Sequence, residues 1–564
     1  MTTSRFGRLG ASVLGATAII TLLTLVARLV GFGRWFAQNA WIGPNEVGAA
    51  YSTANTVPNV LFEVAAGGAL AGAVIPLLAA PIAAHLRKDV DRSASALLTW
   101  TVLVLTPVAA LTWILAPWIV GLLLDGSRAQ DPAQVDLAST LLQMFAIQIP
   151  LYGVGVVLTG VLQAHRRFVA PALAPLLSSL VVLGSYYAFG LLAPSDPAPG
   201  ELTRQAVAWL GWGTTAGVVV LSLPLLVPVA RAGVRLRPTL HFPDGVARRA
   251  RALAFAGMGT LVAQQVSVLV AVRLANQYGD TGGTINVHQY AQAVVLLPYA
   301  VLAVPLATAM FPRLANFAAT GRRDDLARET AHSTRVILVV AALGAGVLVA
   351  VAHQVEDVFA AFARGGVVDG MAGAMTAAAA SVIGLALVFH LSRVLYALEH
   401  ARMAVVAASI GWIGVAVVSI GAVLLTVPSS GDGPATLRAL GLGTSVGTLL
   451  GAGALAYCVR RSLGNEAMSG LARTGVVAIL GALIGALAGR GLGSLFPTAA
   501  VAATIGYAVV IALVATLVTA AVVLVGDRAS ISALRRARGH APAVQTSPDA
   551  VNDGGNAENE GPQR

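Results

Sequence analysis

Two arginines, Arg28 and Arg34, stand inside a long apolar stretch, where a charged side chain is costly and usually has a function. Arg28 has apolar neighbours on both sides, and Arg34 follows six residues later, after Gly31-Phe32-Gly33. Six residues on a continuous helix correspond to about 240° of rotation, so the pair need not share a face unless the glycines unwind the helix. The pair either lines a polar cavity or reaches outward to the lipid headgroups.

Further polar side chains recur at helical spacing in other apolar stretches. Asn55, Asn59 and Glu63 are four residues apart and would form one polar face of a second helix. The second half of the chain carries comparable polar residues: Gln264, Gln265, Arg273, Gln289 and Gln292. Together they predict a polar cavity between two helical lobes. Polar contacts between helices would explain single members of this set, but less easily the whole set.

Enzymatic and metal chemistry are not indicated by any motif. The sequence has no HExxH, no Walker-type glycine loop followed by lysine and no GxSxG. His165, His390 and His400 fall near predicted helix ends without carboxylates at ligand spacing, and are interpreted as interfacial histidines. The single cysteine, Cys458, excludes an intrachain disulfide and a thiolate metal site. We therefore expect no enzyme activity, no cofactor and no metal.

These residues lie in a very apolar chain. It is 57% hydrophobic and 11% charged, whereas a soluble protein carries about 25% charged residues. A bilayer-spanning helix needs about 20 apolar residues. Stretches of that kind lie near 10–30, 48–82, 97–124, 137–163, 170–193, 206–230, 252–276, 288–312, 336–352, 371–397, 401–427, 436–459, 472–489 and 498–525. The sequence therefore predicts an all-α polytopic membrane protein with about fourteen transmembrane helices.

Prolines interrupt two of these stretches. The stretch at 48–82 exceeds one span and contains Pro58 and Pro76. The stretch at 288–312 contains three prolines, Pro298, Pro305 and Pro312. Because proline removes a helical hydrogen bond, we expect kinked or partly broken helices at both places.

Positive charge gathers in every second gap between the stretches. Twenty-eight of the 36 Lys and Arg residues lie there, and by the positive-inside rule these gaps face the cytoplasm. Both termini are then cytoplasmic in a bacterial plasma membrane, and the net charge of +11 is a topology signal that indicates no nucleic-acid partner. The other eight are Arg28, Arg34, Arg128, Arg204, Arg273, Arg364, Arg438 and Arg490.

Two pairs of similar segments indicate an internal duplication. Ala73-Val74-Ile75-Pro76 resembles Ala309-Met310-Phe311-Pro312, 236 residues later, and Val161-Leu162-Gln163-Ala164 resembles Val394-Leu395-Tyr396-Ala397 at an offset of 233. Chance similarity between apolar segments is the alternative. Duplication predicts two six-helix lobes related by a pseudo-two-fold axis along the membrane normal. The predicted parts are an N-lobe at 1–230, a basic cytoplasmic linker at 231–251, a C-lobe at 252–460, two further helices at 472–525 and a disordered cytoplasmic tail at 527–564.

Several motifs together resemble a known family. Arg28-Leu29-Val30-Gly31-Phe32-Gly33-Arg34, Ala50-Tyr51, Ala54-Asn55, Pro58-Asn59 and Ala73-Val74-Ile75-Pro76 resemble the opening signature of the MurJ (MviN) lipid II flippases. This family belongs to the multidrug/oligosaccharidyl-lipid/polysaccharide exporter superfamily. The resemblance continues through Leu297-Pro298-Tyr299, Phe311-Pro312-Arg313-Leu314 and Val394-Leu395-Tyr396-Ala397-Leu398-Glu399, across essentially the whole membrane portion.

The resemblance implies an alternating-access flippase for lipid II, the undecaprenyl-pyrophosphate-linked peptidoglycan precursor. It implies that Arg28 and Arg34 engage the pyrophosphate, which suits the paired, charge-assisted bonds of a guanidinium group. It also implies that residues 472–525 form a groove for the lipid tail, and that membrane lipids and cell-wall synthesis proteins are partners. The alternatives are an exporter of another polyprenyl-linked glycan or of a drug-like cation, and a non-transporting scaffold for cell-wall synthesis.

The chain departs from the family pattern at three charged positions. Ala49 stands where family members commonly carry an acid, Phe62 and Glu63 where an arginine is frequent, and Ala293 where a further cavity arginine occurs. Arg273 is the candidate for partial replacement. The predicted substrate-contacting residues are Arg28, Arg34, Asn55, Asn59, Glu63, Arg273 and Gln292. No pair of membrane aspartates on the late helices suggests a sodium site, so ion coupling stays open.

Overall fold

The computed structural model describes residues 4–64, 71–124, 132–243, 246, 258–279, 283–496 and 500–527, with side chains given from Leu22 and, after the first gap, from Val74. Within these residues every regular element is a helix. The first half contains α1 (Ser4–Trp41), α2 (Glu46–Phe62), α3 (Ala71–Ala83), α4 (Arg87–Ile114), α5 (Ala116–Leu124), α6 (Pro132–Ala146), α7 (Gln148–Ala164), α8 (Val169–Leu192), η2 (Pro199–Glu201), α9 (Arg204–Ser222), η3 (Leu223–Leu225) and α10 (Leu226–Arg231).

The second half repeats this arrangement and then adds two helices. Its elements are α12 (Met258–Tyr278), α13 (Thr284–Pro298), η4 (Tyr299–Ala303), α14 (Val304–Ala319), α15 (Arg323–Ala361), α16 (Met371–Ala378), α17 (Ser381–Ala397), α18 (Ala401–Thr426) and α19 (Gly433–Leu463). The chain continues through η5 (Asn465–Met468) to α20 (Leu471–Gly493) and α21 (Val501–Gly526).

The predicted fold class is confirmed. Each of the fourteen apolar stretches overlaps a helix or a run of consecutive helices. Among the described residues, 11 helices are long and apolar enough to cross a membrane, or 12 if α16 and α17, bent by 40°, are one span. The exact number of fourteen stays a prediction. Several helices also run past their apolar stretches; α15 has 39 residues because polar turns extend it at both ends.

Both proline-rich stretches depart from a single straight helix, as predicted. In the first, α2 contains Pro58 and ends at Phe62, and α3 begins at Ala71; residues 65–70 lie outside the described part. In the second, Pro298 is followed by the five-residue π-helical segment η4 before α14 begins. Proline lacks an N–H group, so the helical ladder must be re-paired nearby, and a π-helical turn is one way of doing so.

Two pairs of turns have the same backbone at the offsets that the sequence repeat predicts. His85, after α3, and Gly321, after α14, are 236 residues apart and have φ values of 55° and 69°. Arg166, after α7, and Glu399, after α17, are 233 apart and have φ values of 57° and 61°. In each of these turns the next N–H bonds the carbonyl five residues earlier, at 2.8 to 3.0 Å. Left-handed conformation is uncommon for residues other than glycine, so this agreement supports duplication over chance similarity.

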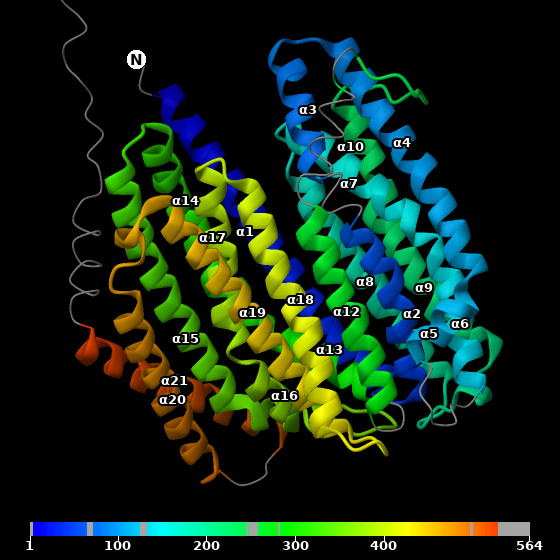
Figure 1. Cartoon of the computed structure of the whole chain (residues 1–564). Helices are drawn as coiled ribbons and strands as arrows, with labels where there is room; N and C mark the ends of the chain where they lie inside the picture. Colours follow the sequence, from blue (N-terminus) through cyan, green and yellow to red (C-terminus); the bar gives the residue numbers. More distant parts are fainter. Residues whose placement is uncertain are drawn as a thin grey trace, which may run out of the picture.

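Figure 1 shows the two lobes side by side, with α20 and α21 along the flank of the second lobe. Those two helices pack on each other and on α15. The lobes converge toward the end of the molecule at which α1 finishes and diverge toward the end at which α1 begins. We call the first of these the closed end; it includes residues 39–49, 190–196, 276–279, 283–286 and 359–367. Helix α1 contacts α8 of the first lobe and α13 of the second.

The chain between the lobes lies along α4. Side chains four residues apart on α4 accept backbone N–H groups from alternate residues of an extended segment: Asp91 from Arg235 at 2.9 Å, Ser95 from Arg237 at 3.0 Å and Thr99 from Thr239 at 3.1 Å. The predicted linker at 231–251 is described up to residue 243 and at 246, and the predicted tail beyond Asp527 lies outside the described residues.

Candidate functional site

The two arginines on α1 point to different lobes. The helix continues without a break through Gly31–Gly33, so the unwinding considered for that segment does not occur. The Nη1 atom of Arg28 lies 3.5 Å from the carbonyl oxygen of Ala300, in the π-helical segment of the second lobe. Arg34 lies close enough to three phenols of the first lobe for its charge to act on them, those of Tyr51, Tyr152 and Tyr186. A single helix thus presents one guanidinium group to each lobe.

The glycines between these arginines face open space. A Cβ atom added at Gly31 or Gly33 would meet no atom within 4 Å. Elsewhere on this stretch of α1, Phe32, Trp35 and Phe36 pack against the core of the second lobe. The glycine positions therefore leave room beside the arginines, whereas glycines in membrane helices often allow tight helix packing.

A phenol cluster organises the side of the first lobe that faces Arg34. The hydroxyls of Tyr51 and Tyr186 are 2.8 Å apart, and Tyr51 also lies 3.3 Å from the Thr214 hydroxyl. Tyr152 donates a hydrogen bond of 3.2 Å to the side-chain oxygen of Asn59. Of these hydroxyls, that of Tyr152 holds Asn59 in place.

Of the three residues predicted to form a polar face on α2, Asn59 bonds the Tyr152 phenol of α7. Asn55 is half-buried one turn earlier, and Glu63 is exposed just after α2 ends. The three uncharged residues at positions where family members commonly carry a charge lie in different surroundings. Ala49 is buried in the core of the closed end, the rings of Phe62 and Tyr152 lie 4.5 Å apart and tilted by 37°, and Ala293 is half-buried.

Another face of α2 joins the lobes directly. Its hydroxyls accept hydrogen bonds from amides of the second lobe: Ser52 from Asn286 at 3.0 Å, Thr53 from Asn276 at 3.0 Å and Thr56 from Gln289 at 3.4 Å. We call these six residues the inter-lobe seam. Gln38 of α1 also donates to Ser52, at 3.0 Å. Gln289, which the sequence placed in the cavity, thus serves the contact between lobes.

The other polar residues predicted for the second lobe have separate partners. Arg273 donates to the carbonyl of Leu122, and Asn276, one turn on, donates to that of Leu123 at 3.2 Å. Both carbonyls belong to the last turn of α5, whose unpaired oxygens attract positive charge. Gln292 contacts Thr444 of α19 at 3.3 Å, inside the second lobe. The hydrogen bonds that the structure describes for Arg273 and Gln292 thus go to residues other than the partners of Arg28 and Arg34.

Arg364 forms the most extensive polar contact between the lobes at the closed end. Its guanidinium group donates to four main-chain carbonyls of the first lobe: Trp41 at 3.1 Å, Gly190 at 2.8 Å, Ala193 at 2.7 Å and Pro194 at 2.8 Å. These oxygens terminate α1 and α8, where helical carbonyls lack partners. Burial lowers the pKa of Arg364 from its usual value. The side chain therefore satisfies two helix ends at once.

Backbone contacts surround this arginine. The Arg364 N–H donates to the Asn39 carbonyl at 3.2 Å, and its carbonyl accepts from the Asn45 side chain at 3.3 Å. Gly43 has φ of 94°, and a Cβ there would lie 1.8 Å from the Arg364 oxygen. Sequence reasoning did not select Arg364 as a site residue. The sequence did mark Arg364 as unusual, because it is one of the eight Lys and Arg residues that lie outside the basic, cytoplasmic gaps.

Two lobes joined at one end, with a helix between them that offers a guanidinium group to each, define a multi-pass membrane protein with a two-lobed helical fold. The chain belongs to the MurJ family: the family model described as "Lipid II flippase MurJ" matches residues 39–524.

Individual proteins are similar to this chain over different lengths. A protein of Rhizobium meliloti (strain 1021), named probable lipid II flippase MurJ, is 28% identical over 310 residues, which are 54% of this chain and 55% of that protein. The chain thus spans about half the length of the curated relatives it matches.

Two solved structures share the fold. The structure titled "Lipid II flippase MurJ, inward closed conformation" has a TM-score of 0.71 and 17% identity, covering 91% of this chain and all of that one. An inward-facing multidrug resistance MATE family transporter of the MOP superfamily has a TM-score of 0.62 and 15% identity, covering 79% of this chain and 96% of that one.

Proposed function

We propose that this protein is a lipid II flippase, which moves the undecaprenyl-pyrophosphate-linked peptidoglycan precursor from the inner to the outer leaflet of a bacterial plasma membrane. The observation that carries the proposal is the placement of Arg28 and Arg34 on one helix, each toward a different lobe, with open space at the glycines between them. A guanidinium group binds phosphate oxygens through paired, charge-assisted bonds. A pyrophosphate between the lobes would neutralise both charges.

Alternating access fits the contacts at the closed end. The seam of α2, α12 and α13 and the carbonyl contacts of Arg364 join the lobes there, and all of them are hydrogen bonds that can break together. The positive-inside rule places both termini and the linker in the cytoplasm, so the closed end faces outward. In this state the substrate enters from the cytoplasmic leaflet, and transport requires the closed end to open. The sequence offers no nucleotide-binding loop, and the protein hydrolyses no ATP of its own.

The last two helices suit the lipid tail of the substrate. Helices α20 and α21 pack on α15, and the outward side of α20 carries large apolar side chains, with Leu483 55% and Leu487 70% exposed. Such a surface supports the assignment of residues 472–525 to a groove for a hydrocarbon chain. The N-lobe at 1–230 and the C-lobe at 252–460 then hold the headgroup between them.

A drug-like cation is a weaker candidate substrate. The MATE likeness concerns the fold alone, and two guanidinium groups beside the space at Gly31 and Gly33 repel a cation. Another polyprenyl-linked glycan would use the same pyrophosphate chemistry.

Depletion in the native host tests the function. Loss of the protein should lower the lipid II exposed on the outer leaflet and stop growth, and the native gene should restore both. An Arg34→Ala gene expressed at the same level is the matched control and should restore neither. Normal lipid II exposure and normal growth after depletion would reject a flippase and favour a scaffold or another substrate.

The proposed orientation has its own test, with introduced thiols in a Cys458→Ser background. Leu240→Cys places a thiol on the linker, where the native side chain is 50% exposed, and Val367→Cys places one at the closed end, where it is 74% exposed. We expect an impermeant reagent to label position 367 in intact cells, and position 240 only after the membrane is opened. Labelling of position 240 in intact cells would show that the orientation is wrong.

A further inference from the structure

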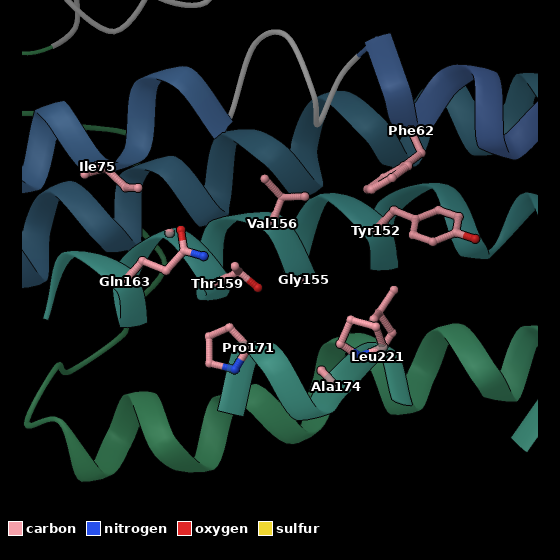
Figure 2. Close-up of a pocket in the computed structure, with 12 residues that line it drawn as sticks. Phe62, Ile75, Tyr152, Gly155, Val156, Thr159, Gln163, Pro171, Ala174 and Leu221 are labelled. Atoms are coloured by element: carbon pink, nitrogen blue, oxygen red, sulfur yellow. The ribbon is translucent and has the colours of Figure 1, made fainter. Parts of the chain in front are cut away.

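The first lobe contains a cavity that the site described above does not use. It has a volume of about 340 Å³ and lies along α7, between the α2–α3 pair and α8. Figure 2 shows Phe62 and Tyr152 toward one end of it, and Ile75, Gln163 and Pro171 toward the other. A side chain that borders it on α3, Ile75, is exposed, so the cavity reaches the protein surface. The pocket is open to a ligand from outside the lobe.

The duplicated lobe fills the same place with its own side chains. At the offsets of the repeat, three small or branched residues of the first lobe correspond to larger ones in the second: Ile75 to Phe311, Val156 to Phe389 and Gly160 to Arg393. The matching turns after α3 and α14, and after α7 and α17, fix this correspondence.

The larger side chains of the second lobe pack on one another. The Arg393 guanidinium lies 4.0 Å from the ring centre of Phe389 and 5.7 Å from that of Phe311, and it donates to the Thr308 hydroxyl at 2.9 Å. Tyr299 meets Phe389 edge-on at 6.0 Å. Cation–π and aromatic contacts of this kind stabilise a packed cluster. The second lobe therefore shows what a filled version looks like, and the cavity in the first lobe is a departure from it.

The lining of the cavity indicates an amphiphilic ligand. Most of it is hydrocarbon from α3, α7 and α8, such as Ile75, Val156 and Pro171. Its polar groups are the Tyr152 phenol at one end, which bonds Asn59 and lies within the field of Arg34, and the Thr159 hydroxyl and Gln163 amide farther along α7. A ligand that fits has an apolar chain next to an anionic group. An engineered cavity of about 150 Å³ holds one benzene ring, so this one accommodates a chain segment of roughly twice that size.

We propose that this pocket binds the first isoprene units of a polyprenyl chain, directly next to the pyrophosphate. The proposal rests on the function proposed above, because that function places the charged group of the substrate at Arg34, beside the polar end of the pocket. Phospholipid acyl chains share the hydrocarbon chemistry, but their headgroups are not expected at Arg34. The first lobe then receives the start of the lipid chain, whereas larger side chains occupy the equivalent positions of the second lobe.

Binding of short substrate analogues to the purified full-length protein tests this. The probes are the precursor headgroup on pyrophosphate, carrying either one isoprene unit or a farnesyl chain of three. Val156→Phe puts into the pocket the residue that the second lobe carries at the equivalent position. Val227→Phe makes the same change at a position on α10 that is 52% exposed and does not line the pocket, and it is the matched control.

We expect the native protein and Val227→Phe to bind the farnesyl analogue about tenfold more tightly than the one-unit analogue, as burial of a few apolar groups predicts. Val156→Phe should lose that advantage and bind the one-unit analogue normally, which also shows that it is folded. If Val156→Phe still binds the farnesyl analogue more tightly than the one-unit analogue, the pocket does not bind the isoprene chain, and the proposed flippase function is unaffected. If phosphatidylglycerol displaces the farnesyl analogue as well as unlabelled farnesyl analogue does, the pocket binds phospholipid acyl chains and the polyprenyl proposal is wrong. Failure of both analogues to bind the native protein would overturn the proposed function together with the pocket.

Discussion

The two lobes share a backbone plan but differ in how their interiors are filled. Around α7 the first lobe has Ile75, Val156 and Gly160 and retains a cavity of about 340 Å³. Around α17 the second lobe has Phe311, Phe389 and Arg393, and the Arg393 guanidinium lies over both rings. The helix that precedes each region passes into a π-helical turn at the equivalent place, at Glu63 in the first lobe and at Tyr299 in the second, so the difference between the lobes lies in side-chain size.

The comparison suggests that duplication supplied a symmetric scaffold and that side-chain size then distinguished the lobes. The second lobe carries the two additional helices, α20 and α21, and its core is continuous with theirs through α15. In the first lobe three phenols lie within the field of Arg34, and the cavity lies beside one of them, Tyr152. The lobes thus differ in side-chain size around equivalent helices, and we propose that the first lobe binds the start of the lipid chain.

The largest effect is expected from the two arginines of α1. Arg28→Ala and Arg34→Ala should each abolish complementation in a depleted host while protein abundance stays near normal, because a charge facing open space contributes binding more than packing. If the first lobe binds the start of the lipid chain, Arg34→Ala should also abolish binding of the one-isoprene analogue, measured on purified protein. Membrane immunoblots give the abundance.

Lysine at the same positions sharpens this prediction. Arg28→Lys keeps the charge but cannot form the paired hydrogen bonds of a guanidinium group, so partial complementation is expected. Full activity in both alanine variants would move the substrate site away from α1. A fall in abundance as large as the fall in activity would instead indicate a structural role.

The next effect concerns the closed end, where the lobes meet. Arg364→Ala removes hydrogen bonds to four helix-terminal carbonyls, and a hydrogen bond to a charged group contributes about 1.5–3 kcal/mol net of water, less where it is partly exposed. We expect the lobes to separate there more often. Spin labels at Glu201→Cys and Val367→Cys, in a Cys458→Ser background, should then report a longer or broader distance distribution.

Arg438→Ala is the matched control for that variant. Arg438 lies in the first turns of α19 and donates to Pro434 of its own helix, at 3.3 Å. Its removal should leave the distance distribution unchanged. An unchanged distribution in Arg364→Ala as well would mean that the seam of α2, α12 and α13 holds the closed end without it.

A smaller effect should distinguish the packed lobe from the hollow one. Phe389→Ala leaves a cavity beside Arg393 and should cost roughly 2–3 kcal/mol of unfolding free energy, below the range for a fully buried phenylalanine because Phe389 is half-buried. Val156→Ala borders existing space and should cost less than about 1 kcal/mol. Thermal unfolding in detergent would measure both, and equal losses would contradict the contrast between the lobes.

The smallest effect is expected at the linker. Ser95 of α4 is buried and accepts the N–H of Arg237 at 3.0 Å. Ser95→Ala should cost about 1 kcal/mol and speed hydrogen exchange at the amide of Arg237, whereas Ser93→Ala, two residues earlier on α4, should leave that amide protected. Unaltered exchange in Ser95→Ala would show that other contacts hold the linker on α4.

The sequence predicted the features that depend on local pattern. Apolar length located the helices, and the segments around Ile75 and Phe311 predicted a repeat whose turns then matched in backbone conformation. Proline predicted the interruption at Pro298. These are consequences of hydropathy and of a missing N–H group, and both can be read from neighbouring residues.

The sequence did not predict how side chains from different helices are placed relative to one another. Whether Arg28 and Arg34 share a face depends on α1 staying helical through two glycines, and packing by Phe32 and Trp35 contributes to that. Arg364 acquired its role from the two helix ends that the fold brings to it. The cavity left no signal either, because valine and isoleucine look like ordinary core residues until their counterparts in the other lobe are compared.

Flipping of lipid II by the purified protein in defined liposomes is the direct test of the proposed flippase activity. We expect labelled lipid II to cross the bilayer faster in vesicles with the native protein than in protein-free vesicles, and Arg34→Ala to return the rate to the protein-free level. Replacement of the pyrophosphate by an uncharged linkage should have the same effect on the native protein. A native rate equal to that of protein-free vesicles, or one unaffected by loss of both Arg34 and the pyrophosphate, would contradict it.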